Sequence, residues 1–168
     1  NNDYKVDTFF KVPEPLIQKE FSRIMSLKDG LKKMSKSELS DLSRINLTDE
    51  KDQILNKIKK AKTDSLPIPS TVKELNSRPE ARNLIGIYSS LANSTLENSI
   101  QDFTGKNFSE FKDKLSQILI DRIGPISNEI KRLLKDKSYL DKILDDGCKK
   151  ADGIASTKIK KIHDIVGF

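Results

Sequence analysis

Two lysines three residues apart are the residues of this sequence best suited to chemistry on phosphate. Lys33 and Lys36 lie among serines in the run Lys33-Met34-Ser35-Lys36-Ser37, and Gly30 precedes it. Lysine binds phosphate as a mobile point charge. Glycine lets the backbone turn, and hydroxyl groups with exposed backbone N–H groups can line an anion site. The residue types therefore predict a phosphate-handling loop. A solvated basic turn is the alternative interpretation.

The segments around this run must position it. Arg23–Leu27 is apolar enough to predict a short buried strand that leads into a turn at Asp29-Gly30. Further upstream, Pro13 and Pro15 indicate extended chain, and residues 16–21 can form a short helical turn.

A helix is predicted to start after Thr48, which suits the N-cap position and precedes two acidic residues. Its apolar face consists of Ile54, Ile58 and Ala61. The lysines are expected on its other side and at its C-terminal end, either simply solvated there or facing RNA: Lys57, Lys59, Lys60 and Lys62. Pro67 and Pro69 then block regular structure. We therefore place a linker at 66–77, between a first domain at 1–65 and a second at 78–168.

The second domain is predicted to be an all-α bundle. Capping patterns predict helix starts at Ser77, Ser94, Asn107 and Ser138. Gly105 is suited to end the second of these helices.

Two further features concern the later helices. Gly124-Pro125 is expected to kink or break the third helix. The apolar face of the last helix has spacings of four and three and consists of Leu140, Leu144, Cys148, Ala151, Ala155, Ile159, Ile162 and Val166.

Composition excludes several kinds of site. The chain has 168 residues, 35% of them hydrophobic, and a net charge of +6, so it can bury a real core and favours anionic partners such as RNA or nucleotides. Cys148 is the single cysteine, which excludes an internal disulfide and a Cys-rich zinc site. We expect it to be a small buried hydrophobe. His163, the single histidine, is expected to be a surface or packing residue. No apolar run has the length needed to cross a membrane.

The pentapeptide matches KMSKS, the second signature of class I aminoacyl-tRNA synthetases, and its flanks resemble the tryptophanyl-tRNA synthetase family. The other blocks that carry this resemblance, in the family's order, are Arg23–Leu27 with Asp29-Gly30, Lys57–Ser65, Asn83–Ser89, Phe103–Lys106, Gly147–Ala151 and Val166–Phe168.

The resemblance implies a mainly α fold, in which the tail of a Rossmann-like α/β catalytic domain carries the KMSKS loop and precedes a helical anticodon-binding bundle. It implies ATP-dependent activation of tryptophan and its transfer to tRNA(Trp), with ATP and Mg²⁺. Lys33 and Lys36 would stabilise the charge on the leaving pyrophosphate. The residues implied to bind ATP are Ile24, Lys33, Met34, Ser35, Lys36 and Ser37.

The implied protein is a cytoplasmic (or organelle-matrix) homodimer that binds tRNA and neither DNA nor a membrane. Candidate contacts to tRNA phosphates are Lys73, Arg78, Arg82 and the pair Lys131-Arg132, with an ordinary charged surface as the alternative for each. A tyrosyl-tRNA synthetase relative is the nearest alternative function. A non-catalytic basic helical module that binds RNA or a protein is the alternative from another class.

The sequence departs from the family pattern in places. Glu38-Leu39 follows the motif where many members have Asp-Pro, and Glu80-Ala81-Arg82 precedes Asn83 where many have Gly-Val-Ser. The first class I signature, a His-Ile-Gly-His-like stretch, does not occur in these residues. We therefore expect a C-terminal fragment that is inactive by itself.

Overall fold

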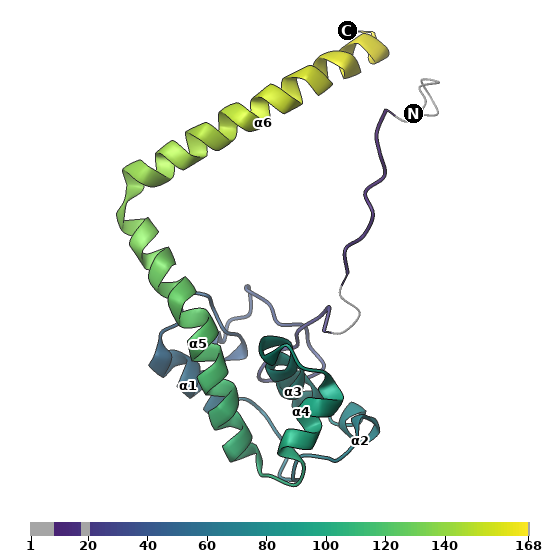
Figure 1. Ribbon diagram of the computed structural model, residues 1–168, viewed down its shortest axis with the longest axis vertical. Helices are drawn as coiled ribbons and strands as arrows, with labels where there is room; N and C mark the ends of the chain where they lie inside the picture. The colour runs from purple at the N-terminus through teal and green to yellow at the C-terminus, as the bar shows by residue number, and fades with distance from the viewer. Residues whose placement is uncertain (1–8, 18–20, 168) are drawn as a thin grey trace. The chain divides into compact units, whose positions relative to one another are not determined.

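The computed structural model describes residues 9–17 and 21–167, and these residues are helical with connecting loops (Figure 1). After a 3-10 turn at Asp41–Ser43, the helices are α1 Lys51–Lys59, α2 Val72–Asn76, α3 Pro79–Ala92, α4 Leu96–Phe103, α5 Phe108–Lys135 and α6 Lys137–Val166. The predicted helical character of the C-terminal part is confirmed.

The predicted strand at Arg23–Leu27 is wrong. In the described residues this segment makes only an isolated antiparallel bridge between Met25 and Lys33. A strand needs a neighbouring strand along its length, and here the partner runs through a tight turn and leaves after one bridge. Leu16 and Ile17 are not helical, and the rest of that predicted turn includes residues outside the described part of the chain.

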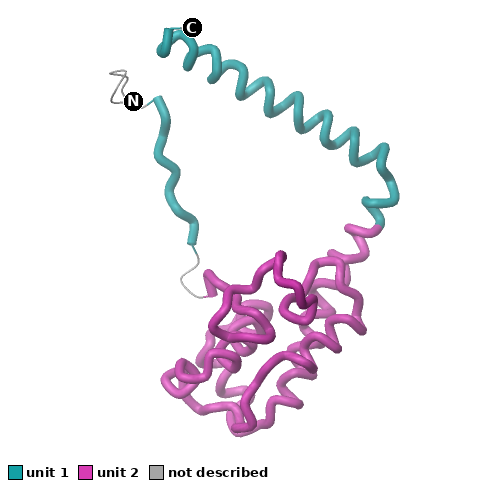
Figure 2. Tube along the Cα trace, turned by 180° about the vertical axis from the view of Figure 1, so that it is seen from behind, with its two compact units in different colours: residues 1–17, 132–168 teal, residues 18–131 magenta. Residues whose placement is uncertain are grey.

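The chain divides into two compact units (Figure 2). We call residues 18–131 the core unit and residues 1–17 with 132–168 the terminal unit. The boundary between them falls within α5, while the predicted linker at 66–77 lies inside the core unit. The domain boundary expected at that linker stays a prediction.

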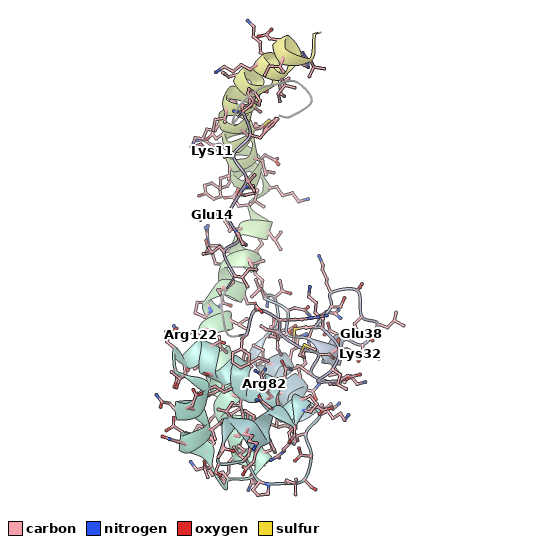
Figure 3. All side chains as sticks on the ribbon, turned by 90° about the vertical axis from the view of Figure 1, so that its right-hand side faces the viewer. Lys11, Glu14, Lys32, Glu38, Arg82 and Arg122 are labelled. Carbon is pink, nitrogen blue, oxygen red and sulfur yellow. The ribbon has the colours of Figure 1, made fainter. Side chains whose placement is uncertain are left out.

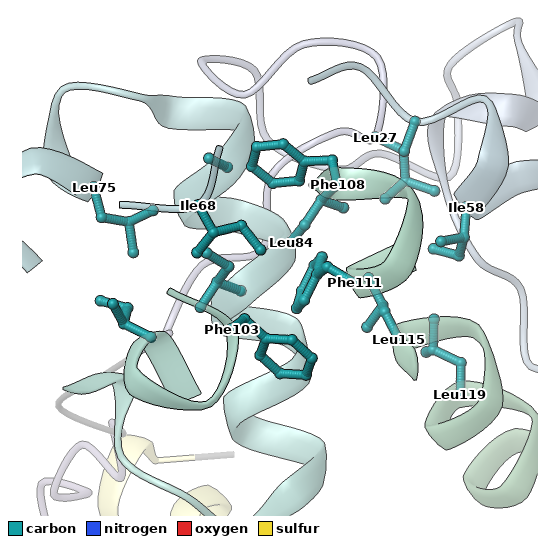
Figure 4. Packing of buried hydrophobic residues seen from close by; sticks show 14 of the residues in the cluster. Leu27, Ile58, Ile68, Leu75, Leu84, Phe103, Phe108, Phe111, Leu115 and Leu119 are labelled. Carbon is teal, nitrogen blue, oxygen red and sulfur yellow. The ribbon is translucent and has the colours of Figure 1, made fainter. Parts of the chain in front are cut away.

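An aromatic cluster lies at the centre of the core unit (Figure 4). The ring of Phe111 is fully buried and meets the rings of Phe103 and Phe108 edge-on, at centroid distances of 5.0 and 6.2 Å. Tyr88 of α3 joins them, 5.0 Å from Phe103. Edge-to-face aromatic pairs add to the free energy gained from burial alone. Leu27 and Ile68, from outside the helices, are buried in the same core.

Several helix starts agree with the capping patterns. Asn107 accepts a hydrogen bond from the backbone N–H of Glu110 at the start of α5, as predicted. The cap of α4 is Thr95, one residue after the predicted Ser94. Gly105 follows the end of α4 with φ +76°, a conformation that glycine adopts without strain.

Other predicted starts are wrong. Glu50, not Thr48, caps α1 through reciprocal hydrogen bonds with Gln53. The capping box predicted at Ser77 does not form at the start of α3, because the Ser77 hydroxyl donates instead to Glu74 O at the end of α2. Helix α2 itself was not predicted from the sequence. Asp136, two residues before the predicted Ser138, caps α6.

The two longest helices differ from expectation in other ways. Helix α5 runs without a break through Pro125, so the predicted break does not occur and the kink stays a prediction. Ile123 and Ser127, on either side of the proline, are buried. Helix α6 includes all the residues of the predicted apolar face, yet none of its residues is buried. Cys148 is exposed, so its predicted burial is wrong.

Candidate functional site

The pentapeptide follows a short hairpin within the core unit. Backbone N–H groups of Ser26 and Met34 donate to Lys32 O and Ile24 O, at 2.8 and 3.0 Å, on either side of the bridge between Met25 and Lys33. The second of these bonds places Ile24 beside Met34, so two of the predicted ATP-contacting residues are brought together. Ile24 is 43% exposed, so it is not buried as the predicted strand at Arg23–Leu27 would require.

The second half of the pentapeptide is a polar turn. The hydroxyl groups of Ser35 and Ser37 are 3.0 Å apart, and the Ser37 N–H donates to Ser35 Oγ at 3.3 Å. The Glu38 N–H then donates to Ser35 O at 3.4 Å. Serine side chains that bond to nearby backbone groups favour such turns over regular structure. The turn sets the spacing between Lys33 and Lys36.

The two motif lysines are exposed, and within the described residues neither ammonium group has an ion-pair or hydrogen-bond partner. Their neighbour Lys32 differs, because its Nζ is 3.6 Å from Asp29 Oδ2. Figure 3 shows Lys32 and Glu38, the residues that flank the pentapeptide, at the edge of this unit. The loop therefore presents two uncompensated positive charges to solvent.

The hairpin is fixed at its base by backbone hydrogen bonds to later parts of the chain. Leu27, which is buried, donates from its N–H to Ser43 O at 2.9 Å and accepts at its carbonyl from the Lys62 N–H at 2.7 Å. The segments before and after α1 thus both contact the hairpin. A loop anchored in this way holds its charged end in a defined place.

Helix α3 supplies a second anchor. The side-chain amide of Asn83 accepts from the Met25 N–H at 2.9 Å and donates to Met25 O at 2.8 Å. Asn83 is 5% exposed, and no role was predicted for it from the sequence. The signal that could have found it is an asparagine on the buried face of a helix, which needs hydrogen-bond partners there.

The turn of the hairpin packs against the start of the same helix. An added Cβ on Gly30 would lie 2.5 Å from the Glu80 nitrogen, so only glycine fits. The pKa of the Glu80 carboxyl is lowered, first by the hydrogen bond from Lys62 and also by the Gly30 N–H.

A buried charge network holds the chain after the motif. Lys57 is 3% exposed, and its Nζ lies 2.6 Å from Asp49 Oδ2 and 2.7 Å from Asp41 Oδ2. Arg44 contacts Asp41 and donates to Glu38 O at 2.9 Å. The hydrogen bond from Lys57 is the main cause of the lowered pKa of Asp41. The predicted solvated position of Lys57 is therefore wrong, because two carboxylates on the preceding loop draw it inward.

Most of the candidate tRNA-contacting cations have partners within the protein. Arg78 bonds to both oxygens of Asp64 and to Pro67 O, and Arg82 donates to Asn76 Oδ1 at 2.8 Å. Lys131 bonds to Glu50 Oε1. Lys73 is exposed on α2. The bonded groups have structural roles, whether or not they also meet a ligand.

The described residues form neither a cluster of metal ligands nor a membrane-spanning helix. These residues bring together no group of three or more His, Cys, Asp or Glu side chains that suits a metal ion. Proteins often hold Mg²⁺ by only one or two carboxylates together with substrate phosphates. No helix among them is long and apolar enough to cross a membrane.

Comparison with known proteins identifies the hairpin's context. The family model described as class I tRNA synthetases (W and Y) matches residues 1–123. The chain belongs to this family. The family match includes the whole of the hairpin and the pentapeptide, so the class I resemblance predicted from the motif is confirmed.

The curated relatives of this class I synthetase chain are named Tryptophan–tRNA ligase. The protein from Brucella melitensis is 48% identical over 166 residues, which cover 99% of this chain and 47% of the relative. The protein from Rickettsia felis is 49% identical over 158 residues, covering 94% and 47%. The chain thus spans about half the length of the curated relatives it matches.

Solved structures show the same fold. The crystal structure of tryptophanyl-tRNA synthetase from Mycoplasma pneumoniae gives a TM-score of 0.81 at 24% identity, covering 99% of this class I synthetase chain and 49% of that one. The Campylobacter jejuni enzyme complexed with ADP and tryptophan gives 0.66 at 23% identity, covering 95% and 48%. The family model and the curated relatives favour the synthetase interpretation over the non-catalytic module.

Proposed function

We propose that this chain belongs to a tryptophan–tRNA ligase and that Lys33–Ser37 is the loop that handles the phosphates of ATP. The observation that carries the proposal is a pair of exposed lysines, Lys33 and Lys36, that have no ion-pair or hydrogen-bond partner among the described residues and that stand on a hairpin with fixed anchors. The curated relatives support tryptophan as the amino acid, since they are tryptophan ligases at 44–49% identity. The relatives compared above are all named for tryptophan, which favours tryptophan over the tyrosine alternative.

The proposed chemistry is activation of tryptophan. Its carboxylate attacks the α-phosphorus of ATP, the bond to the β-phosphate oxygen breaks, and pyrophosphate leaves with the developing negative charge. The ammonium groups of Lys33 and Lys36 would contact the pyrophosphate and stabilise that charge. One lysine–phosphate contact at 4 Å is worth about 4 kcal/mol before desolvation at an effective dielectric near 20. Half of that, gained only in the transition state, raises the rate roughly thirtyfold.

The other motif residues have supporting roles in this proposal. Met34 and Ile24, joined by a backbone hydrogen bond, would contact the adenine side of ATP. Ser35 and Ser37 would offer hydroxyl and backbone groups to the phosphates, as they already do to each other.

The remaining parts of the proposal concern the whole enzyme. It would work in the cytoplasm (or an organelle matrix) as a homodimer, with Mg²⁺ supplied on the nucleotide and tRNA(Trp) as acceptor. The hairpin and its anchors would form the tail of a Rossmann-like catalytic domain, and the later helices a tRNA-binding part.

The test is tryptophan-dependent ATP–pyrophosphate exchange by the full-length protein. Lys36→Ala is expected to lower the exchange rate by more than about tenfold, because one charge on the leaving group is lost. Lys28→Ala is the matched control, since Lys28 is another exposed lysine on the same hairpin. It is expected to keep the wild-type rate.

Two results would contradict the proposal at different points. Absence of tryptophan-dependent exchange in the wild-type protein would remove the assigned activity. A loss of less than about tenfold in Lys36→Ala, or an equal loss in Lys28→Ala, would remove the assigned role of the loop.

A further inference from the structure

Asn83 completes the hydrogen bonding of the residue that pairs with Lys33. Because the bonds flanking the bridge come from Ile24, Ser26, Lys32 and Met34, the N–H and C=O of Met25 point away from Lys33. The Asn83 amide meets both of these groups, at 2.9 and 2.8 Å. A single side chain thus takes the place that a third strand would have.

We propose that Asn83 is a positioning residue for the phosphate loop, acting through Met25 to fix where Lys33 stands. This inference rests on the proposed function and adds to it a residue outside the motif, 50 positions after Lys33.

The site is built rather than incidental. Asn83 is 5% exposed, and its amide group makes both of these bonds to one residue 58 positions earlier. A side-chain amide has one acceptor and one donor group, which fit the N–H and C=O of a peptide unit. No other residue type offers this pair at the same length.

The helix that carries Asn83 contacts the hairpin at its turn as well. Gly30 lies against the backbone of Pro79 and Glu80, in the first turn of α3. Asn83 follows one turn later and holds the bridge. Two contacts about one helical turn apart define both the position and the direction of the hairpin relative to α3. A shift of the hairpin would move the Lys33 ammonium group, and an error near 1 Å at a reacting centre can cost about a hundredfold in rate.

The test uses Asn83→Ala in the full-length protein, with Ser89→Ala as the matched control. Ser89 is on the same helix, is 2% exposed and donates to Ser94 O at 2.6 Å, so its loss also removes a buried hydrogen bond but not one to the hairpin. We expect Asn83→Ala to lower kcat of pyrophosphate exchange at least about tenfold while KM for tryptophan changes less than about twofold. Ser89→Ala is expected to keep kcat.

A double-mutant cycle separates positioning from general damage. If Asn83 acts through Lys33, then Asn83→Ala has little further effect once Lys33 is alanine. Ser89→Ala has the same small effect in both backgrounds. Equal fold-losses from Asn83→Ala in the wild-type and Lys33→Ala backgrounds would overturn the inference. An inactive wild type would instead point to failure of the proposed function.

Amide hydrogen exchange gives a readout that does not depend on activity. The Ser26 and Met34 N–H groups, which bond across the hairpin, are expected to exchange at least about tenfold faster in Asn83→Ala than in wild type, and at an unchanged rate in Ser89→Ala. Unchanged protection of these two amides in a folded Asn83→Ala protein would also overturn the inference.

Discussion

At the scale of single residues, a lysine expected on the outer side of its helix has the most buried charge among the described residues of the core unit. Lys57 is 3% exposed and Asp49 is 4% exposed, and they are in direct contact. Removing one member of a buried ion pair leaves the other charge without compensation, which is costlier than losing an exposed pair. The network also reaches the loop after the motif through Asp41 and Arg44.

Lys57→Ala is therefore expected to lower the free energy of unfolding by about 3 kcal/mol, because the buried Asp49 loses its cation and keeps only the hydrogen bonds from Asn46. Urea unfolding followed by circular dichroism measures the change. Lys60→Ala, at an exposed position at the end of the same helix, should change it by no more than about 0.5 kcal/mol. Similar values for the two variants would show that the buried pair contributes nothing.

The residue scale also shows where a sequence pattern is insufficient. Periodicity correctly assigned Ile54 and Ile58 to the buried face of α1, and Ala61, which follows the end of that helix, is buried as well. It placed Lys57 on the opposite side because the pattern counts only apolar residues. The carboxylates that draw Lys57 inward come from a loop whose path no periodicity describes.

At the scale of elements, α3 connects the hairpin with the segment before it in the core unit. Arg78, just ahead of its first turn, bonds to Asp64, Leu66 and Pro67, which precede and enter the predicted linker. The segment with two prolines is irregular as predicted, but Ile68 within it is buried and bonded to the chain at Gly105-Lys106. The two prolines correctly predicted that this segment lacks regular structure, but they did not predict that part of it is buried.

This contact has a pH dependence with a definite sign. The pKa of Asp64 is lowered from its ordinary value of 3.8, mainly by the hydrogen bond from Arg78. Its stabilising contribution is thus full above the unfolded-state pKa and is lost as the pH falls through the lower, folded-state pKa. On acidification from about pH 5 to pH 3, the melting temperature of wild type should fall more steeply than that of Asp64→Asn.

Asp113→Asn is the control for that comparison, since Asp113 is exposed on α5. Its melting temperature should follow the wild-type curve over the same range. Parallel curves for wild type and Asp64→Asn would mean that the bond to Arg78 does not stabilise the fold.

At the scale of the whole molecule, burial is concentrated in one of the two compact units. The hydrophobic core runs from Leu27 to Ile123 and lies in the core unit, whereas α6 has no buried residue. The apolar face of α6 was predicted correctly from its spacings, and its burial was not. Spacing tells which residues share a face, but only a partner surface buries that face.

This contrast predicts unequal protection of backbone amides in the 168-residue chain. Isolated helices are marginally stable, and most helical stability in proteins comes from packing. Amides in the middle of α6 should therefore exchange with deuterium faster than those of α3, whose Leu84 and Ile85 are buried. Equal protection, measured by mass spectrometry of peptides, would show that α6 is packed.

The family membership was predictable because it rests on a contiguous motif and blocks in order. The hydrogen bonds that anchor the motif could not be predicted from the sequence, because they join residues far apart in the chain. Asn83 and Met25 are 58 positions apart, and Leu27 pairs with Lys62 across the whole of α1. No local pattern states such a pairing.

The exposed thiol of Cys148 makes the chain ready for chemical labelling. It is the only cysteine in these residues, so a maleimide dye would attach at one known position on α6 without any mutation. A dye there would report on changes in the surroundings of α6, which has no buried residue. The same side chain that was expected to fill a core thus becomes a reporter for the surface of the molecule.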